Sequence, residues 1–154
     1  VLYLPTFGKL FAAGRAGERM IGGDSGATAV VEGAGSNACE YMTGGQVVVL
    51  GRVGKNFGAG MTGGMAFIYD PQDSFVDRAN PETLQIGRIQ HTHWESVLRE
   101  LIIEHAAATE SVLAARLLNQ WTTAVKHFWQ VVPSEIIPTL EVPLGIDDAV
   151  SQTA

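Results

Sequence analysis

The sequence contains one cysteine, no long hydrophobic run and no basic patch. The lone Cys39 excludes an internal disulfide and favours a reducing, cytoplasmic setting. Because no run of about 18 apolar residues occurs, we expect no membrane span. Ten lysines and arginines against sixteen acidic residues give a net charge of −6, so we expect no binding to nucleic acid or to an anionic membrane.

The beginning of the sequence lacks an initiator Met, a basic segment leading into an apolar run and a small-residue cleavage site. We therefore expect that a signal peptide is absent or already removed. Val1 begins in the middle of a sequence pattern, which favours a piece of a longer protein. With 154 residues, 46 % of them hydrophobic, the chain has enough apolar surface for a domain of ordinary size.

Glycine is abundant and regularly spaced in the first part of the chain. All glycines except Gly87 and Gly145 lie between Gly8 and Gly64, and they recur with a period of 18 and then 19 residues. The two columns of the repeat are Gly17, Gly35, Gly54 and Gly26, Gly44, Gly63. Each glycine of the second column follows a hydroxyl residue and precedes a short apolar run, which indicates one structural unit stacked on copies of itself.

The repeat predicts strands and turns rather than helices. Short β-branched runs bounded by Gly and Thr are typical of strands, and glycines provide the positive φ that tight corners need. No crossover helix fits in the short gaps between the runs. We therefore predict a mainly β fold, a right-handed parallel β-helix with coils of 18–19 residues over residues 1–70, followed by C-terminal α-helices.

The pattern changes after Asp70. Helical spacing of apolar residues from Trp94 to His105 predicts an amphipathic helix, and Thr109 could cap a second one. A third helical stretch is expected from about Trp121 to Trp129, ended by Pro133. The predicted organisation is β-helix repeats over 1–70, a connecting segment over 71–93, a helical extension over 94–132 and a loose tail over 133–154.

The segment Gly58–Gly63 matches GxGxxG, which binds a dinucleotide in Rossmann domains when a strand precedes it and a helix follows. Here the residues after Gly63 predict a strand, and the same glycines belong to the repeat, so we favour a structural role. A small dinucleotide-binding enzyme is the alternative. The segment Gly51–Asn56 lacks the full spacing and the Ser or Thr of a phosphate loop, so we do not expect it to be one.

Five side chains are candidates for metal or nucleophilic chemistry. His91, His93 and Glu95 could be half of a metal site, but no third ligand accompanies them, and the start of a helix is the simpler interpretation. His105 lies on an apolar stripe, which favours a packed core imidazole. Cys39 has no His at a suitable spacing to activate it, so we interpret its thiol as a small core side chain.

The remaining polar candidates show no catalytic pattern. Glu18, Glu32 and Glu40 occur once per repeat at uneven columns, which suits solvated edges better than an acid and base pair. His127 has no evident partner. The sequence therefore predicts no catalytic, cofactor-binding or metal-binding residue in this chain.

Three runs carry a resemblance to a known family: SGATAVVEG at residues 25–33, CEYMTGG at 39–45 and NFGAGMTGG at 56–64. They closely resemble the C-terminal GXGXG domain of the glutamate synthase large subunit, and the similarity extends from Gly8 to about Pro133. Two places depart from the family pattern. Gly23-Asp24 stands where the family usually has Arg-Asn, and Ala38 stands where glycine is common.

The resemblance implies a scaffold domain within an enzyme that makes two glutamates from glutamine and 2-oxoglutarate. In this family an N-terminal cysteine releases ammonia, and an FMN barrel with a 3Fe-4S cluster carries out the reduction. These parts are not in this chain, so the resemblance implies no cofactor here. It implies the amidotransferase and FMN-binding domains as partners, and leaves open whether ferredoxin or NAD(P)H supplies the electrons.

Two further expectations follow from the predicted β-helix. A free-standing β-solenoid binding module without catalysis is the alternative to the scaffold. An isolated fragment would also expose unpaired strand backbone, and we expect it to self-associate through that edge.

Overall fold

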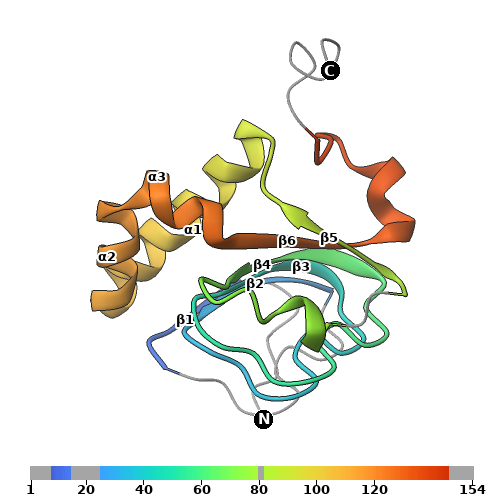
Figure 1. Cartoon of the computed structure of the whole chain (residues 1–154), viewed down its shortest axis with the longest axis horizontal. Helices are drawn as coiled ribbons and strands as arrows, with labels where there is room; N and C mark the ends of the chain where they lie inside the picture. Colours follow the sequence, from blue (N-terminus) through green and yellow to red (C-terminus); the bar gives the residue numbers. More distant parts are fainter. Residues whose placement is uncertain (1–7, 15–24, 80–81, 146–154) are drawn as a thin grey trace.

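The computed structural model describes residues 8–14, 25–79 and 82–145. A single six-stranded sheet, in the order β1-β2-β3-β4-β6-β5, forms its centre (Figure 1). The strands are β1 (Lys9–Ala12), β2 (Ser25–Val31), β3 (Thr43–Val49), β4 (Gly63–Tyr69), β5 (Leu84–Arg88) and β6 (Phe128–Pro133). The first four are parallel to one another, whereas β6 is antiparallel to both β4 and β5.

The predicted right-handed parallel β-helix is wrong as the fold class. The structure is a mixed α/β fold with one mixed sheet, and the described part of each repeat contributes one strand to it rather than two or three. Two strands from beyond Asp70, β5 and β6, extend the sheet in the antiparallel sense. The alternative of a free-standing β-solenoid module and the expected self-association through a β-helix edge both presuppose that fold class, and they lose their basis with it.

The sequence repeat accounts for the parallel half of the sheet. Ala29 pairs with Val47, and Val47 pairs with Ala66, so each strand lies beside its counterpart in the next repeat. The loops between these strands also lie side by side, because Asn37 N–H donates to the Lys55 carbonyl (2.8 Å) and Tyr41 N–H donates to the Ala59 carbonyl (2.8 Å). Gly17, Glu18 and the Gly23-Asp24 step lie outside the described residues.

Both faces of the sheet are buried, and they belong to two separate cores. Val47 and Val49 pack in one core with loop side chains that include Cys39 and Phe57. Val48, between them on the strand, packs in the other core with the helices, as the alternation of side chains along a strand requires. Figure 1 shows the helices gathered at one side of the sheet and the repeat loops below it.

The helices follow β5 along the chain. They are α1 (Thr92–Thr109), α2 (Val112–Asn119) and α3 (Trp121–Ala124), and the 3₁₀ turns are η1 (Val76–Arg78), η2 (Val125–His127) and η3 (Ser134–Thr139). The helix predicted from Trp94 to His105 is present as α1, which buries both of these residues. In the described part of the chain, no helix has the length and apolar character that a membrane crossing requires.

Two helical predictions need correction. Ser111, not Thr109, caps α2 by accepting a hydrogen bond from the Ala114 N–H (3.1 Å); Thr109 ends α1 and donates to the His105 carbonyl (2.8 Å). The stretch predicted as helical up to Trp129 becomes strand β6 at Phe128. Phe128 is fully buried, and its strand lies between β4 and β5, so the tertiary position overrides the local pattern.

The segment after β6 packs on the helical side of the molecule. Ile136, Ile137, Leu140, Val142 and Leu144 contact the core that contains the helices. The Trp94 indole N–H donates to the Pro143 carbonyl (3.0 Å), which ties this segment to the start of α1. The division of the chain into four segments stays a prediction, and residues 146–154 of the predicted loose tail lie outside the described residues.

Asp70 organises the turn that leaves β4. Its carboxylate accepts hydrogen bonds from the N–H of Phe75 (2.9 Å) and Ser74 (3.1 Å) and from the Trp129 indole (2.9 Å). Burial alone would raise the pKa of Asp70, but these bonds, with one from the Ser74 hydroxyl, outweigh it and hold the pKa below its ordinary value. The carboxylate therefore stabilises the fold in its charged form.

A substitution at Gly45 tests how closely successive repeats must approach each other. It has φ +84, and a Cβ there would lie 2.1 Å from the Ala27 carbonyl oxygen. We expect Gly45→Ala to lower the free energy of unfolding by about 3 kcal/mol or more, because both the backbone angle and the overlap are unfavourable. Gly87→Ala is the matched control, since a Cβ at Gly87 meets nothing within 4 Å. Equal urea midpoints for the two variants would contradict this account.

Asp70 also gives the fold a defined dependence on pH. Because its pKa is lowered in the folded state, its stabilisation is present above the ordinary aspartate pKa of about 3.9 and is lost as the pH falls through the folded-state value. We expect Asp70→Asn to cost about 1–3 kcal/mol at neutral pH and to flatten the acid side of a plot of unfolding free energy against pH. The exposed Asp73→Asn serves as the control; an unchanged acid limb for Asp70→Asn would refute the assignment.

Candidate functional site

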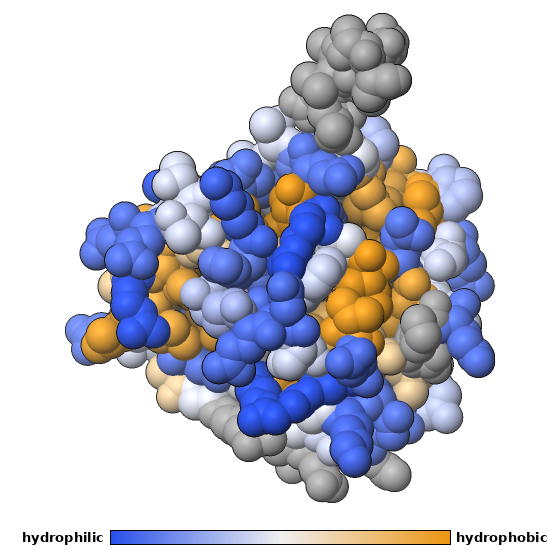
Figure 2. All heavy atoms as spheres, in the orientation of Figure 1, coloured by the Kyte–Doolittle hydropathy of each residue, from blue (hydrophilic) through white to orange (hydrophobic). Residues whose placement is uncertain are grey.

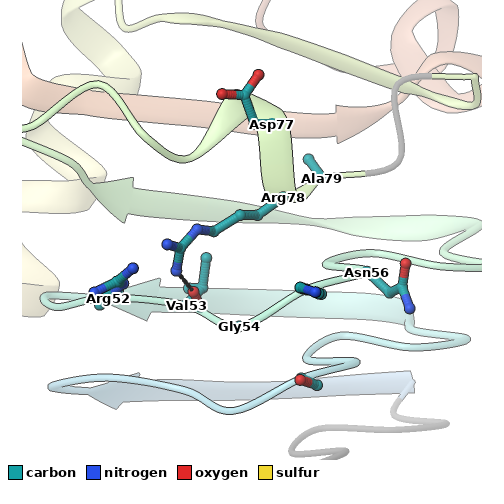
Figure 3. Close-up of a pocket in the computed structure, with 9 residues that line it drawn as sticks. Arg52, Val53, Gly54, Asn56, Asp77, Arg78 and Ala79 are labelled. Carbon is teal, nitrogen blue, oxygen red and sulfur yellow. Dashed lines mark hydrogen bonds between the residues drawn. The ribbon is translucent and has the colours of Figure 1, made fainter.

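A hollow of about 750 Å³ lies between the repeat loops and η1 (Figure 3). The polar side chains that line it are Ser36, Arg52, Lys55, Asn56, Asp77 and Arg78. They come from three separate stretches of the chain. The site is therefore assembled by folding and is not visible as a local cluster in the sequence.

Close backbone contacts bring these three stretches together. A Cβ at Gly54 would lie 2.5 Å from the Ser36 nitrogen, so only a glycine allows these neighbouring loops to approach this closely. The Phe57 N–H donates to the Arg78 carbonyl (2.9 Å), which places η1 beside the loop between β3 and β4. The Arg78 guanidinium then donates to the Val53 carbonyl (2.6 Å), as Figure 3 shows.

Three of the four charged residues that line the hollow are cations. Arg52 and Lys55 are exposed and Arg78 is half-buried. Among the described residues, neither Arg52 nor Lys55 forms an ion pair with a carboxylate. Asp77 is the one acidic side chain among the described residues that line this hollow, and Figure 3 shows its carboxylate on the side away from the Arg78 guanidinium.

A second hollow, of about 390 Å³, continues the positive surface. Arg52 lines this hollow too, together with Arg116 of α2. We call Arg52, Lys55, Arg78 and Arg116 the basic band. The prediction of no basic patch is wrong at this place, because folding gathers four of the ten cationic residues along two adjoining hollows.

The chemistry of the basic band is that of anion recognition. Guanidinium and ammonium groups bind carboxylates and phosphates through charge-assisted hydrogen bonds, and arginine can do so with two parallel bonds. The residues that line the first hollow include no cysteine or histidine. Throughout the described ranges, no group of three or more His, Cys, Asp or Glu side chains is placed to hold a metal ion.

The glycines of the GxGxxG segment lie in turns and at the start of a strand. Gly58 and Gly60 have φ +74 and +69, and Gly63 begins β4. A Cβ at Gly63 would lie 2.0 Å from the Thr43 carbonyl oxygen. Because the segment leads into a strand, the helix whose N-terminus binds the pyrophosphate in a Rossmann site is missing after Gly63.

Cys39 is fully buried in the loop-side core. Burial raises the pKa of its thiol to about 12, since a thiolate there would lose its hydration. Its backbone is in the left-handed region, with φ 59. The thiol is therefore a packed core group with no nucleophilic character at neutral pH.

The histidines predicted as a possible half metal site form the start of α1. His91 is the residue before the helix, and its Nδ1 accepts a hydrogen bond from the His93 N–H (3.1 Å). Glu95 accepts a hydrogen bond from the Trp121 indole N–H (3.1 Å). His127 packs edge to face against Tyr69, with ring centroids 6.3 Å apart.

His105 and Glu32 form a pair that the sequence did not indicate. His105 is fully buried, and its Nε2 lies 3.0 Å from a carboxylate oxygen of Glu32, which follows β2. The contact connects α1 to the repeats across 73 residues of sequence. Glu18 lies outside the described residues, and Glu40 is half-buried in a repeat loop.

The basic band is the feature that sequence reasoning missed. Arg52 and Lys55 lie in the Gly51–Asn56 segment, which does not have the pattern of a phosphate loop. The available signal was two cations near the same repeat corner. The contribution of Arg78 and Arg116 could not be read from the sequence, because it depends on how η1 and α2 pack.

Comparison with known proteins gives a consistent set of relatives. A family model described as the GXGXG motif matches residues 1–134. The glutamate synthase (NADPH) large chain of Azospirillum brasilense is 57 % identical over 151 residues, which cover 98 % of this chain and 10 % of the relative. The ferredoxin-dependent glutamate synthase of Pyropia yezoensis is 51 % identical over 132 residues, covering 86 % of this chain and 9 % of the relative.

A third relative has another electron donor in its name. The glutamate synthase (NADH) of Schizosaccharomyces pombe is 44 % identical over 140 residues, covering 91 % of this chain and 7 % of the relative. The chain thus spans about a tenth or less of the length of these relatives. Because ferredoxin, NADPH and NADH all occur among their names, the similarity does not select one donor.

Cys39 provides a direct test of the loop-side core. We expect no reaction of the native chain with a thiol reagent such as DTNB at pH 8, because the thiol is buried and its pKa is about 12. In denaturant the same residue should react completely. Rapid stoichiometric labelling of the native chain would contradict the placement of Cys39.

Proposed function

The chain belongs to the GXGXG-motif family, and on that premise we propose that it is the C-terminal scaffold domain of a glutamate synthase large chain. The parent enzyme would make two glutamates from glutamine and 2-oxoglutarate, with its glutaminase, FMN and 3Fe-4S sites in other domains. The role of this chain would be to hold those domains in place.

The observation that carries this proposal is the pattern of similarity. Relatives named as glutamate synthases align along nearly the whole chain, at up to 57 % identity in the alignments above, yet the chain spans only about a tenth of their length. High identity over so small a share of a large enzyme supports a domain with a fixed place in the assembly. The activity itself would then belong to the complete polypeptide.

The use made of its polar residues supports a structural role. Asp70, Ser111 and Glu95 are each engaged in hydrogen bonds that hold turns or helices. Cys39 is a core side chain. These groups stabilise the fold rather than line a hollow together, which is the arrangement that catalysis would need.

The proposal predicts a clear division of activity. We expect the purified 154-residue chain to show neither glutaminase turnover nor flavin reduction, because the groups for both reactions would lie in other domains. In the full-length enzyme, Gly45→Ala should lower the amount of folded, active protein while leaving the KM for glutamine unchanged. Gly87→Ala is the control. Glutamine hydrolysis by the isolated chain, or a changed KM in the folded variant, would overturn the proposal.

A further inference from the structure

Resting on the proposed function, we propose that the basic band docks a carboxylate-rich segment of the parent polypeptide that lies outside these 154 residues. The two hollows along which Arg52, Lys55, Arg78 and Arg116 lie form the binding surface. This assigns an occupant to a surface that no part of the described ranges fills.

The geometry favours an extended acidic segment over a single small anion. Arg52 lines both hollows, Lys55 and Arg78 line the first, and Arg116 lines the second, so the cations are spread over two hollows that share Arg52. The volumes of the two hollows are about 750 and 390 Å³, which leaves room for several side chains. A lone anion would occupy only part of this space.

The charges of the described residues leave the basic band unbalanced. Arg52, Lys55 and Arg116 form no ion pair with any described carboxylate. Of the two acidic residues that line the hollows, Asp70 is buried and occupied by four hydrogen bonds. Only Asp77 is exposed. A chain with a net charge of −6 therefore concentrates uncompensated positive charge here.

The exposed cations of the basic band determine the chemistry of the partner. Exposed ion pairs contribute little one at a time, so several carboxylates in one segment are needed to make docking stable. About nine tenths of the relatives' length lies outside the region that this chain matches, which supplies the segment at high effective concentration.

The lysines make the inference testable, because the chain carries only Lys9, Lys55 and Lys126. Amine acetylation followed by mass spectrometry should find Lys55 at least about fivefold less reactive in the full-length protein than in the 154-residue chain. That protection should weaken in high salt. A zero-length carboxyl-to-amine cross-linker should join Lys55 to an Asp or Glu outside these 154 residues.

Variants of the full-length protein show whether Lys55 is protected by an ionic contact or only by burial under another domain. The double substitution Arg52→Gln and Arg116→Gln should raise the reactivity of Lys55 in the full-length protein several-fold. Neither arginine forms an ion pair with a described carboxylate, so the fold does not lose one. Arg99→Gln, which removes one exposed cation from α1 outside the basic band, should leave it unchanged. Equal effects of these substitutions, or protection of Lys55 without any cross-link, would overturn the inference in favour of a neutral contact.

The reactivities of the three lysines also distinguish a failure of acidic-segment docking from a failure of the scaffold role. If Lys9 or Lys126 is protected in the full-length protein and Lys55 is not, the domain packs elsewhere; the inference is then wrong and the scaffold proposal stands. If none of the three lysines changes its reactivity, both are contradicted. Cross-links from Lys55 only to carboxylates within this chain would also overturn the inference.

Discussion

The close approach of one repeat to the next is the constraint on which the structure depends. At Gly45, Gly51 and Gly63 an added Cβ would lie between 2.0 and 2.1 Å from a carbonyl oxygen of the preceding repeat. No side chain fits in that space, so glycine is required at these three positions for the repeats to approach this closely. The same close packing brings Ser36 to Gly54 and so builds the floor of the first hollow.

The sheet formed by these strands separates two hydrophobic cores. The repeat loops cover one face and the helices cover the other. Asp70 stands where the chain passes from the repeats to the C-terminal part, and Trp129 of β6 donates to it. His105 and Glu32 make a second connection between the two parts. The C-terminal elements are therefore built into the sheet and its helical core.

The sequence supported local features better than the arrangement of the whole. The 18- and 19-residue spacing correctly related β2, β3 and β4, because register between repeats is set by the glycines and the apolar runs. The helical periodicity from Trp94 to His105 correctly located α1. The fold class was wrong because Leu84–Arg88 and Phe128–Pro133 have no repeat of their own. Their strand character comes from pairing partners far away in the sequence. The basic band was missed for the same reason, since Arg78 and Arg116 reach Arg52 only through tertiary packing.

The strand order has a consequence for how the molecule is made. β6 lies between β4 and β5, so an interior position next to the edge of the sheet is filled by the last of the described strands to be synthesised. Until Pro133 has emerged, the edge of β4 has no neighbour and can pair with another nascent chain. Closure of the sheet is therefore a late event that joins residues about sixty positions apart, which makes it slow compared with the formation of α1.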